Sequence, residues 1–186
     1  MEGISLFEHA LKIAPESRDL GNLACPSRRA FDDQVNVLFH AQLPCLENAS
    51  LQIEHALLLR PNRCGRIYAG VECLSHMTPL IDWYLRIVDM SDAVYVFGLR
   101  DWQPPRHPNL RYIALLPEFN LAHERFLIVD CPNQYAALVA REMKQPAGES
   151  SESRRFDAFN SSEPATVSLL ALALEKVIDQ SGAVKD

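Results

Sequence analysis

The sequence of 186 residues contains no apolar run as long as the roughly 18 residues that a membrane-spanning helix needs. Its N-terminus lacks the basic start, the apolar block and the small-residue cleavage site of a signal peptide. We therefore expect a cytoplasmic protein without a membrane span. Hydrophobic residues make up 48% of the chain and charged residues 23%, and this balance indicates an ordinary globular domain.

Several signatures of catalysis and metal binding are also missing. The seven glycines are scattered and form no phosphate-binding loop, and there is no G-x-S-x-G, Walker, dinucleotide-binding or H-E-x-x-H motif. The five cysteines include no C-x-x-C pair, and the six histidines lack metal-ligand spacing. We expect no catalytic residue, no metal, no cofactor and reduced thiols, and we keep a redox-sensing cysteine pair as an alternative.

Positive charge is scarce, and the formal net charge is -6. Broad contact with nucleic acid needs clustered Lys and Arg, which this chain has only as the pairs Arg28-Arg29 and Arg154-Arg155. The composition therefore predicts no direct contact with nucleic acid.

Apolar residues at helical spacing predict helices over residues 4–14, 30–41 and 46–59, with Pro44 as the break between the last two. Residues 18–27 are predicted to be irregular. Thr78 and Pro79 are typical of a helix start, and they predict a helix over residues 79–90. A last, well-buried helix is expected from about residue 165 to residue 180.

β-Prone runs predict strands at 67–72 and 93–98, joined by the 79–90 helix in a parallel βαβ unit. Further strands are predicted at 110–116, 126–131 and 135–141, and the last two form a hairpin because only three residues separate them. A short strand over 154–159 is the weakest of the set. The predicted fold is α/β, a three-layer domain with a mixed sheet of about five strands in which a meander follows the βαβ unit, and with helices on both faces.

Ligands of open α/β sheets bind beyond the carboxyl ends of the parallel strands. Here those ends are Glu72 and the loop after the second strand, which carries Arg100, Asp101, Trp102 and Arg106. Trp and Arg are enriched in binding hot spots, so this loop, together with the polar loop 145–153, is the predicted binding surface. The alternative is that Trp102 only packs on the body of the domain.

Two further residues are binding candidates, Glu124 before one strand of the hairpin and Arg141 at the end of the other. Adjacent acidic and basic groups can act in catalysis, but they more often form ion pairs at strand ends. The sequence leaves both interpretations open, and we predict binding rather than catalysis.

Three segments in order resemble the DICT sensory domain, which is associated with diguanylate cyclases and two-component systems. They are VYVFGLRDWQPP, then LRYIALLPEFNLAHERFLIVDCPNQYAALVARE, then RRF before a C-terminal helix. The similarity covers roughly residues 27–178. It divides the chain into an N-terminal helical segment (1–26), a DICT-like domain (27–180) and a tail (181–186). Where the family has Glu-Trp-Phe, this chain has Glu124-Arg125-Phe126, and if the family's Trp lines a pocket, Arg125 would change the polarity of that pocket.

The resemblance implies a non-enzymatic sensory or adaptor module of bacterial, including cyanobacterial, signal transduction. Its expected partner is a signalling protein such as a kinase, a response regulator or a cyclase-type output, with or without a small ligand. The alternative is a GAF-like domain that binds a small molecule or a chromophore. No cysteine is followed by His, which argues against covalent bilin attachment. An enzyme of unrecognised type is the third interpretation.

Overall fold

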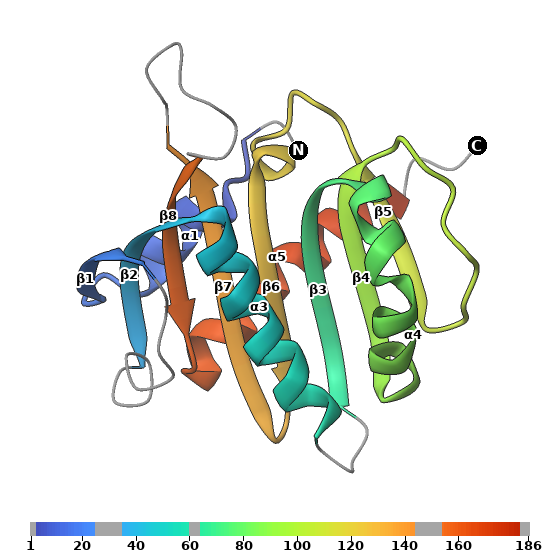
Figure 1. Ribbon diagram of the computed structural model, residues 1–186, viewed down its shortest axis with the longest axis horizontal. Coiled ribbons are helices and arrows are strands. Elements are labelled where there is room, and N and C mark those ends of the chain that lie inside the picture. The colour runs from blue at the N-terminus through green and yellow to red at the C-terminus, as the bar shows by residue number, and fades with distance from the viewer. Residues whose placement is uncertain (1–2, 25–34, 60–63, 144–153, 183–186) are drawn as a thin grey trace.

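The computed structural model describes residues 3–24, 35–59, 64–143 and 154–182. They form one eight-stranded mixed sheet in the order β1-β2-β8-β7-β6-β3-β4-β5 (Figure 1). In chain order the strands are β1 (Arg18–Leu23), β2 (Asn36–Gln42), β3 (Cys64–Cys73), β4 (Ser91–Leu99), β5 (Leu110–Leu115), β6 (Glu124–Cys131), β7 (Gln134–Glu142) and β8 (Arg155–Ser161). Strands β3, β4 and β5 are parallel to one another, and β6 and β7 form an antiparallel hairpin next to β3.

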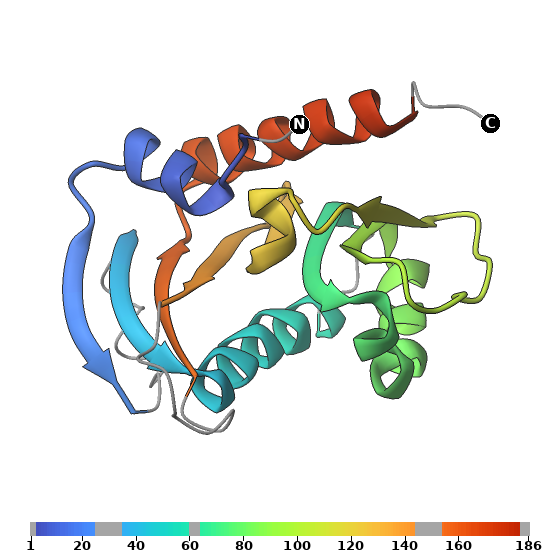
Figure 2. The same ribbon diagram turned by 90° about the horizontal axis from the view of Figure 1, so that it is seen from above.

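Helices cover both faces of the sheet. Helices α1 (Leu6–Ile13) and α5 (Pro164–Gly182) lie on one face, and α3 (Leu43–Leu58) and α4 (Ile81–Asp89) lie on the other (Figure 2). The short 3-10 helices are η1 (Leu74–Leu80), which leads into α4, and η2 (Asn120–His123), which leads into β6. The three-layer α/β class, the parallel β3–β4 pair and the β6–β7 hairpin are therefore as predicted from the sequence.

The number of strands is larger than the predicted five or so, and β5 does not belong to a meander. Strand β5 is parallel to β4, because the chain from Leu99 to Leu110 crosses back along the sheet before the strand begins. The segment that forms β1 is predicted from the sequence to be irregular, and that prediction is wrong. It is an edge strand in which no residue is buried, and Gly21 has a positive φ of 66° within it, so its sequence has no alternating apolar pattern.

Residues 36–42 form strand β2, although helical spacing predicts a helix there. Val37, Phe39 and Ala41 alternate as buried residues, and this period of two fits a strand. Short apolar runs fit both periods, and antiparallel pairing with β8 decides between them.

Proline also has different roles from those predicted. Pro44 lies in the first turn of α3 rather than between two helices. In a first turn its missing N–H costs nothing, because no residue of the helix would accept a hydrogen bond from it. Pro79 lies inside η1, and α4 begins only at Ile81 without a side-chain cap. The predicted 79–90 helix is therefore a 3-10 helix followed by a shorter α-helix.

Candidate functional site: a groove between two helices

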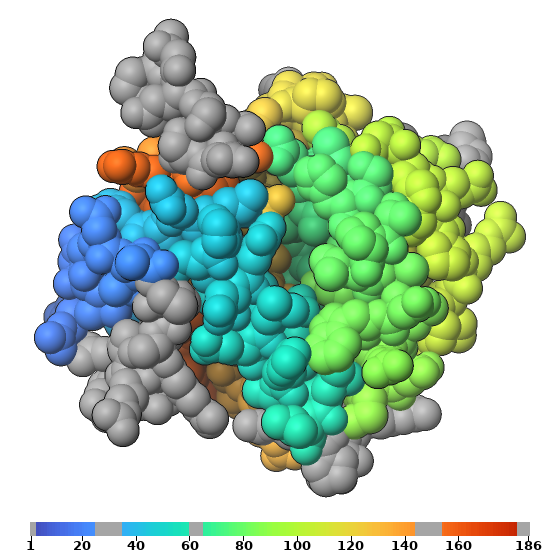
Figure 3. All heavy atoms as spheres, viewed as in Figure 1, coloured from blue at the N-terminus to red at the C-terminus, as the bar shows by residue number. Residues whose placement is uncertain are grey.

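A groove lies on the α3/α4 face of the sheet, between α3 on one side and η1 with α4 on the other (Figure 3). Helices α3 and α4 contact each other at one end of the groove. There the rings of His55 and Trp83 lie 5.0 Å apart, and Glu54 accepts hydrogen bonds from α4. Toward the start of α3 the two walls separate, and the groove opens to a volume of about 610 Å³.

The floor of the groove is apolar and includes several small side chains. It includes Ala69 on β3, Leu127 on β6 and Ala140 on β7, all of them buried. The lips carry Leu51 and Leu80, which are 43% and 38% exposed. The described residues that line the groove are Leu46, Glu47, Ser50, Leu51, Glu54, Ala69, Gly70, Val71, Ser75, His76, Met77, Pro79, Leu80, Tyr84, Arg125, Phe126, Leu127, Leu138 and Ala140.

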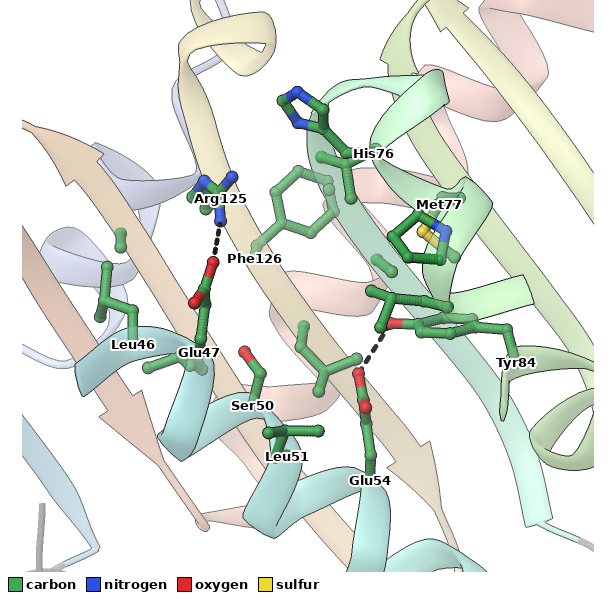
Figure 4. Close-up of a pocket in the computed structure, with 18 of the residues that line it drawn as sticks. Leu46, Glu47, Ser50, Leu51, Glu54, His76, Met77, Tyr84, Arg125 and Phe126 are labelled. Carbon is green, nitrogen blue, oxygen red and sulfur yellow. Dashed lines mark hydrogen bonds and ion pairs between the residues drawn. The ribbon is translucent and has the colours of Figure 1, made fainter. Parts of the chain in front are cut away.

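One end of the groove holds the buried carboxyl group of Glu54 (Figure 4). Trp83 Nε1 donates to its Oε2 at 3.0 Å, and the Tyr84 hydroxyl donates to its Oε1 at 2.9 Å. Burial raises the pKa of Glu54 above its ordinary value, because neutral donors compensate only part of the lost hydration. Each carboxylate oxygen has a second lone pair, so this end can accept a further hydrogen bond.

The other end of the groove holds Arg125, the first residue of β6 that lines the groove (Figure 4). Its Nη1 lies 4.0 Å from Oε1 of Glu47 on α3, which is the outer limit of an ion pair. Its Nε is buried and has no hydrogen-bond partner among the described residues. Burial lowers the pKa of Arg125, as expected for a cation that is poorly compensated.

The other carboxylates near Arg125 are held by a second arginine. Arg154 donates to both oxygens of Glu142, at 2.8 and 2.7 Å, and to Glu72 at 3.1 Å. These bonds raise the pKa of Arg154, and they lower the pKa of Glu142. Arg125 is therefore left with the long contact to Glu47 as its own ion pair in the described part of the chain.

The sequence-predicted site residues lie elsewhere, and none of the seven lines the groove. Glu72, at the end of β3, is the nearest, through its contact with Arg154. Asp101 accepts hydrogen bonds from the backbone and the hydroxyl of Ser75, and Trp102 is half-buried and packs against the apolar cluster around α4. Arg100 and Arg106 are exposed. Trp102 packs as the alternative interpretation expects, and a binding role for this loop stays a prediction.

Glu124 and Arg141 face each other across the β6–β7 ladder, on the α1 side of the sheet. Glu124 accepts hydrogen bonds from the Ser5 hydroxyl at 2.5 Å and from the Leu6 N–H at 2.7 Å, so it holds the N-terminus of α1. Arg141 bonds to Glu8 of the same helix. The contacts of both residues anchor α1 to the sheet. The 145–153 loop lies outside the described residues.

The prediction of reduced cysteines is wrong for Cys131, which is disulfide-bonded at the end of β6. Spacing along the sequence could not reveal this, because strand pairing brings distant residues together. Within the described ranges, no group of three His, Cys, Asp or Glu side chains could hold a metal ion, and no helix is long and apolar enough to cross a membrane.

Reasoning from the sequence missed most of the groove. Glu54 looks like a polar position on an amphipathic helix, and its partners lie 29 and 30 residues away. Arg125 is the exception, since it replaces a Trp of the resembled family. The structure puts that residue in a pocket.

No known family profile matches the chain, and no curated protein matches it. The resemblance to the DICT domain therefore stays a prediction. Among solved structures, the chain is similar to TrmBL2, described as an archaeal chromatin protein with a novel mode of DNA binding. The TM-score is 0.52 at 12% sequence identity, over 94% of this chain and 59% of that one. NucT from Helicobacter pylori gives a TM-score of 0.43 at 11% identity, over 77% of this chain and 95% of that one.

The likeness to TrmBL2 corrects the expectation about partners, which named a signalling protein and excluded nucleic acid. A fold similar to this one occurs in a protein described as a DNA-binding chromatin protein, so nucleic acid is no longer excluded as a partner. Identity this low establishes similarity of fold alone. The chain has an α/β fold similar to part of TrmBL2.

Proposed function

We propose that this chain is a non-enzymatic sensory domain that binds a small molecule in the groove between α3 and α4. The observation that carries the proposal is the groove itself, about 610 Å³ in volume, with an apolar floor and a polar group at each end. Small-molecule sites are typically 300–1,000 Å³, mostly apolar, with a few polar groups that orient the ligand. The groove matches that description in each respect.

The lips of the groove favour an occupant. Leu51 and Leu80 are large apolar side chains on opposite walls, and both are substantially exposed. Exposed apolar area that concentrates around a concavity is typical of a binding site, since a ligand would remove it from water.

The polar groups of the groove favour binding over catalysis. A nucleophile needs a base within hydrogen-bond reach. The Ser75 hydroxyl donates to the Asp101 carboxylate, but hydrogen bonds from Ser75 lower the pKa of Asp101 and so make it a weak base. Within the described residues no hydrogen bond joins Ser50 to His76. Glu54 and Arg125 each sit at an end, where they can orient a ligand.

The DNA binding described for TrmBL2 makes DNA the macromolecule to test beside small molecules. On the described surface, Arg66, Arg141 and Arg154 are all engaged by carboxylates. A contact with phosphate through these three residues would have to displace their carboxylates. Arg100 and Arg106 are exposed, but they are two residues of one loop, whereas the groove is an already formed concavity. For this reason the groove is the primary site in our proposal.

The test is to fill the groove without touching either polar end. Ser50 lies on α3 inside the groove, and a Ser50→Trp side chain would occupy the space above the floor. The uncharged fluorescent probe N-phenyl-1-naphthylamine should bind the wild type saturably, and Ser50→Trp should weaken that binding by about tenfold or more through steric exclusion.

The matched control is Leu172→Trp, an exposed position of α5 on the opposite face of the sheet. It should leave probe binding unchanged. Circular dichroism and urea unfolding of all three proteins verify that they are folded. Absence of saturable binding to the wild type, or equal binding by wild type and Ser50→Trp, would refute the proposed function.

A further inference from the structure

Helix α3 sets the distance between the two polar ends of the groove. Glu47, which contacts Arg125, and Glu54 lie on the same helix, seven residues or about two turns apart. At 1.5 Å per residue the two positions are about 10 Å apart along α3. A ligand that reaches both polar ends must therefore be extended, with its own polar groups at opposite ends.

Arg125 specifies the chemistry at the open end. Its guanidinium has five N–H donors in a fixed plane, a geometry that suits two carboxylate oxygens. The buried Nε has no partner in the described part of the chain, and a buried unmade hydrogen bond is costly. A ligand carboxylate at this end would bind the outer N–H donors of the guanidinium and compensate its charge.

Glu47 is the group with which a ligand carboxylate must compete. Its side chain is 58% exposed and 4.0 Å from Arg125, so its attraction is screened by water. Glu72 and Glu142 also face Arg125, but Arg154 holds both. A ligand carboxylate that binds in the plane of the guanidinium, away from water, should therefore pair with Arg125 more strongly than Glu47 does.

Glu54 specifies the other end. Its oxygens already accept from Trp83 and Tyr84, and both of these donors are fixed by α4. The lone pairs that remain favour a ligand that donates, such as a hydroxyl or an amine, over one that accepts. Between the two ends lies apolar surface, with Leu51 and Leu80 on the lips and Ala69 below.

We infer that the groove binds an extended aliphatic or aromatic acid, whose carboxylate pairs with Arg125 and whose far end donates a hydrogen bond to Glu54. The inference rests on the proposed function and gives its ligand a chemical class. The body of the ligand lies on the apolar floor. Neutral apolar molecules and peptide helices would use the same surface without both polar ends, and the test below distinguishes them.

The experiment measures displacement of N-phenyl-1-naphthylamine by three probes with the same eight-carbon chain. They are octanoate, 8-hydroxyoctanoate and 1-octanol. The wild type should prefer octanoate to 1-octanol by about tenfold, the value of one charge-assisted hydrogen bond in a partly buried site. The added hydroxyl of 8-hydroxyoctanoate should strengthen binding severalfold through Glu54.

Three groove variants separate the two ends. Arg125→Gln should abolish the preference for octanoate over 1-octanol. Glu47→Gln should strengthen octanoate binding about two- to fivefold, because it removes the competing carboxylate. Glu54→Gln should remove the advantage of 8-hydroxyoctanoate and leave octanoate unchanged. The control is Arg66→Gln, which changes the charge equally at an exposed pair with Glu175 and should alter no preference.

The outcomes for this inference differ from those for the proposed function. If the neutral probe binds the wild type and Ser50→Trp excludes it, but octanoate and 1-octanol bind equally well, the groove is a binding site and the acid class is wrong. Equal loss of all probes in Arg125→Gln would also overturn the inference, since it indicates a structural role. A synthetic amphipathic helix that displaces the probe more strongly than every acid would replace it with a peptide ligand.

Discussion

The two faces of the sheet are packed differently, although the same strands supply both. On the α1/α5 face the inward side chains are large and mostly aromatic, among them Tyr68, Tyr95, Phe126 and Phe159, and they form one continuous cluster under both helices. On the α3/α4 face the buried residues divide into two clusters, one under α3 and one under η1 and α4. The groove lies between them, over a floor that includes alanines. The small side chains of the floor thus leave open the space that α3 and α4 do not fill.

Among the described residues, each face also has one buried carboxyl side chain, and the two make different contacts. Glu124 on the filled face accepts backbone N–H groups from the first turn of α1, where a negative charge is favoured. Glu54 on the hollow face accepts only side-chain donors and borders the groove. The first holds a helix in place. The second remains able to accept a hydrogen bond from a ligand, as the proposed site requires.

The largest expected effect tests the difference in packing. Leu174 on α5 is fully buried in the continuous cluster, and Leu51 on α3 is 43% exposed at the lip of the groove. Leu174→Ala should lower the free energy of unfolding by about 2–5 kcal/mol, because it removes contacts and leaves a cavity. Leu51→Ala should lower it by less than about 1 kcal/mol. Urea unfolding of both variants measures the comparison, and equal losses would mean that the two faces are packed alike in solution.

A smaller effect is expected at Glu124. Glu124→Gln keeps the shape of the side chain but removes the charge that accepts from Ser5 and from the first N–H groups of α1. The expected loss is about 1–2 kcal/mol, as for other helix caps and charged hydrogen bonds. Hydrogen exchange should show the loss of protection concentrated in α1. Uniform loss of protection across the sheet would contradict the role of Glu124 as the anchor of this helix.

Much of the fold on both faces of the sheet could be predicted from the sequence, but the groove could not. The βαβ unit, the β6–β7 hairpin and the helices on both faces follow from local period and turn signals, which are properties of neighbouring residues. Strand β2 could not be predicted from such local signals, because it forms by pairing with β8, which lies more than a hundred residues later in the chain. Edge strand β1 has no apolar pattern to detect.

The groove was beyond sequence reasoning for a related reason. A hollow is set by what two elements fail to fill, and no local pattern records the distance between α3 and α4. Glu54 acquires its role only through Trp83 and Tyr84. The strand-end rule points instead to the loop that carries Trp102, whose role in binding still requires a test. Arg125 stands out in the sequence because it departs from a resembled family, and the structure adds its place at the open end of the groove.

The smallest expected effect concerns the pH dependence of stability on the hollow face. Burial raises the pKa of Glu54 above its ordinary value, so the folded state binds its proton more tightly than the unfolded state does. Stability contributed by this group is therefore present at low pH and is lost as the pH rises from 4.5 through the folded-state pKa. Glu54→Gln does not titrate, so the free energy of unfolding of the wild type should fall relative to this variant over that range and level off above it.

Asp101→Asn is the control of opposite sign, because hydrogen bonds from Ser75 lower the pKa of Asp101 and its contribution is lost as the pH falls. Urea unfolding from pH 2.5 to pH 8 compares the three proteins, because the contribution of Asp101 is lost below its ordinary pKa of 3.8. A wild type that gains stability relative to Glu54→Gln as the pH rises would mean that the hydrogen bonds from Trp83 and Tyr84 outweigh the burial of Glu54, and the contrast between the two faces would then be one of packing alone.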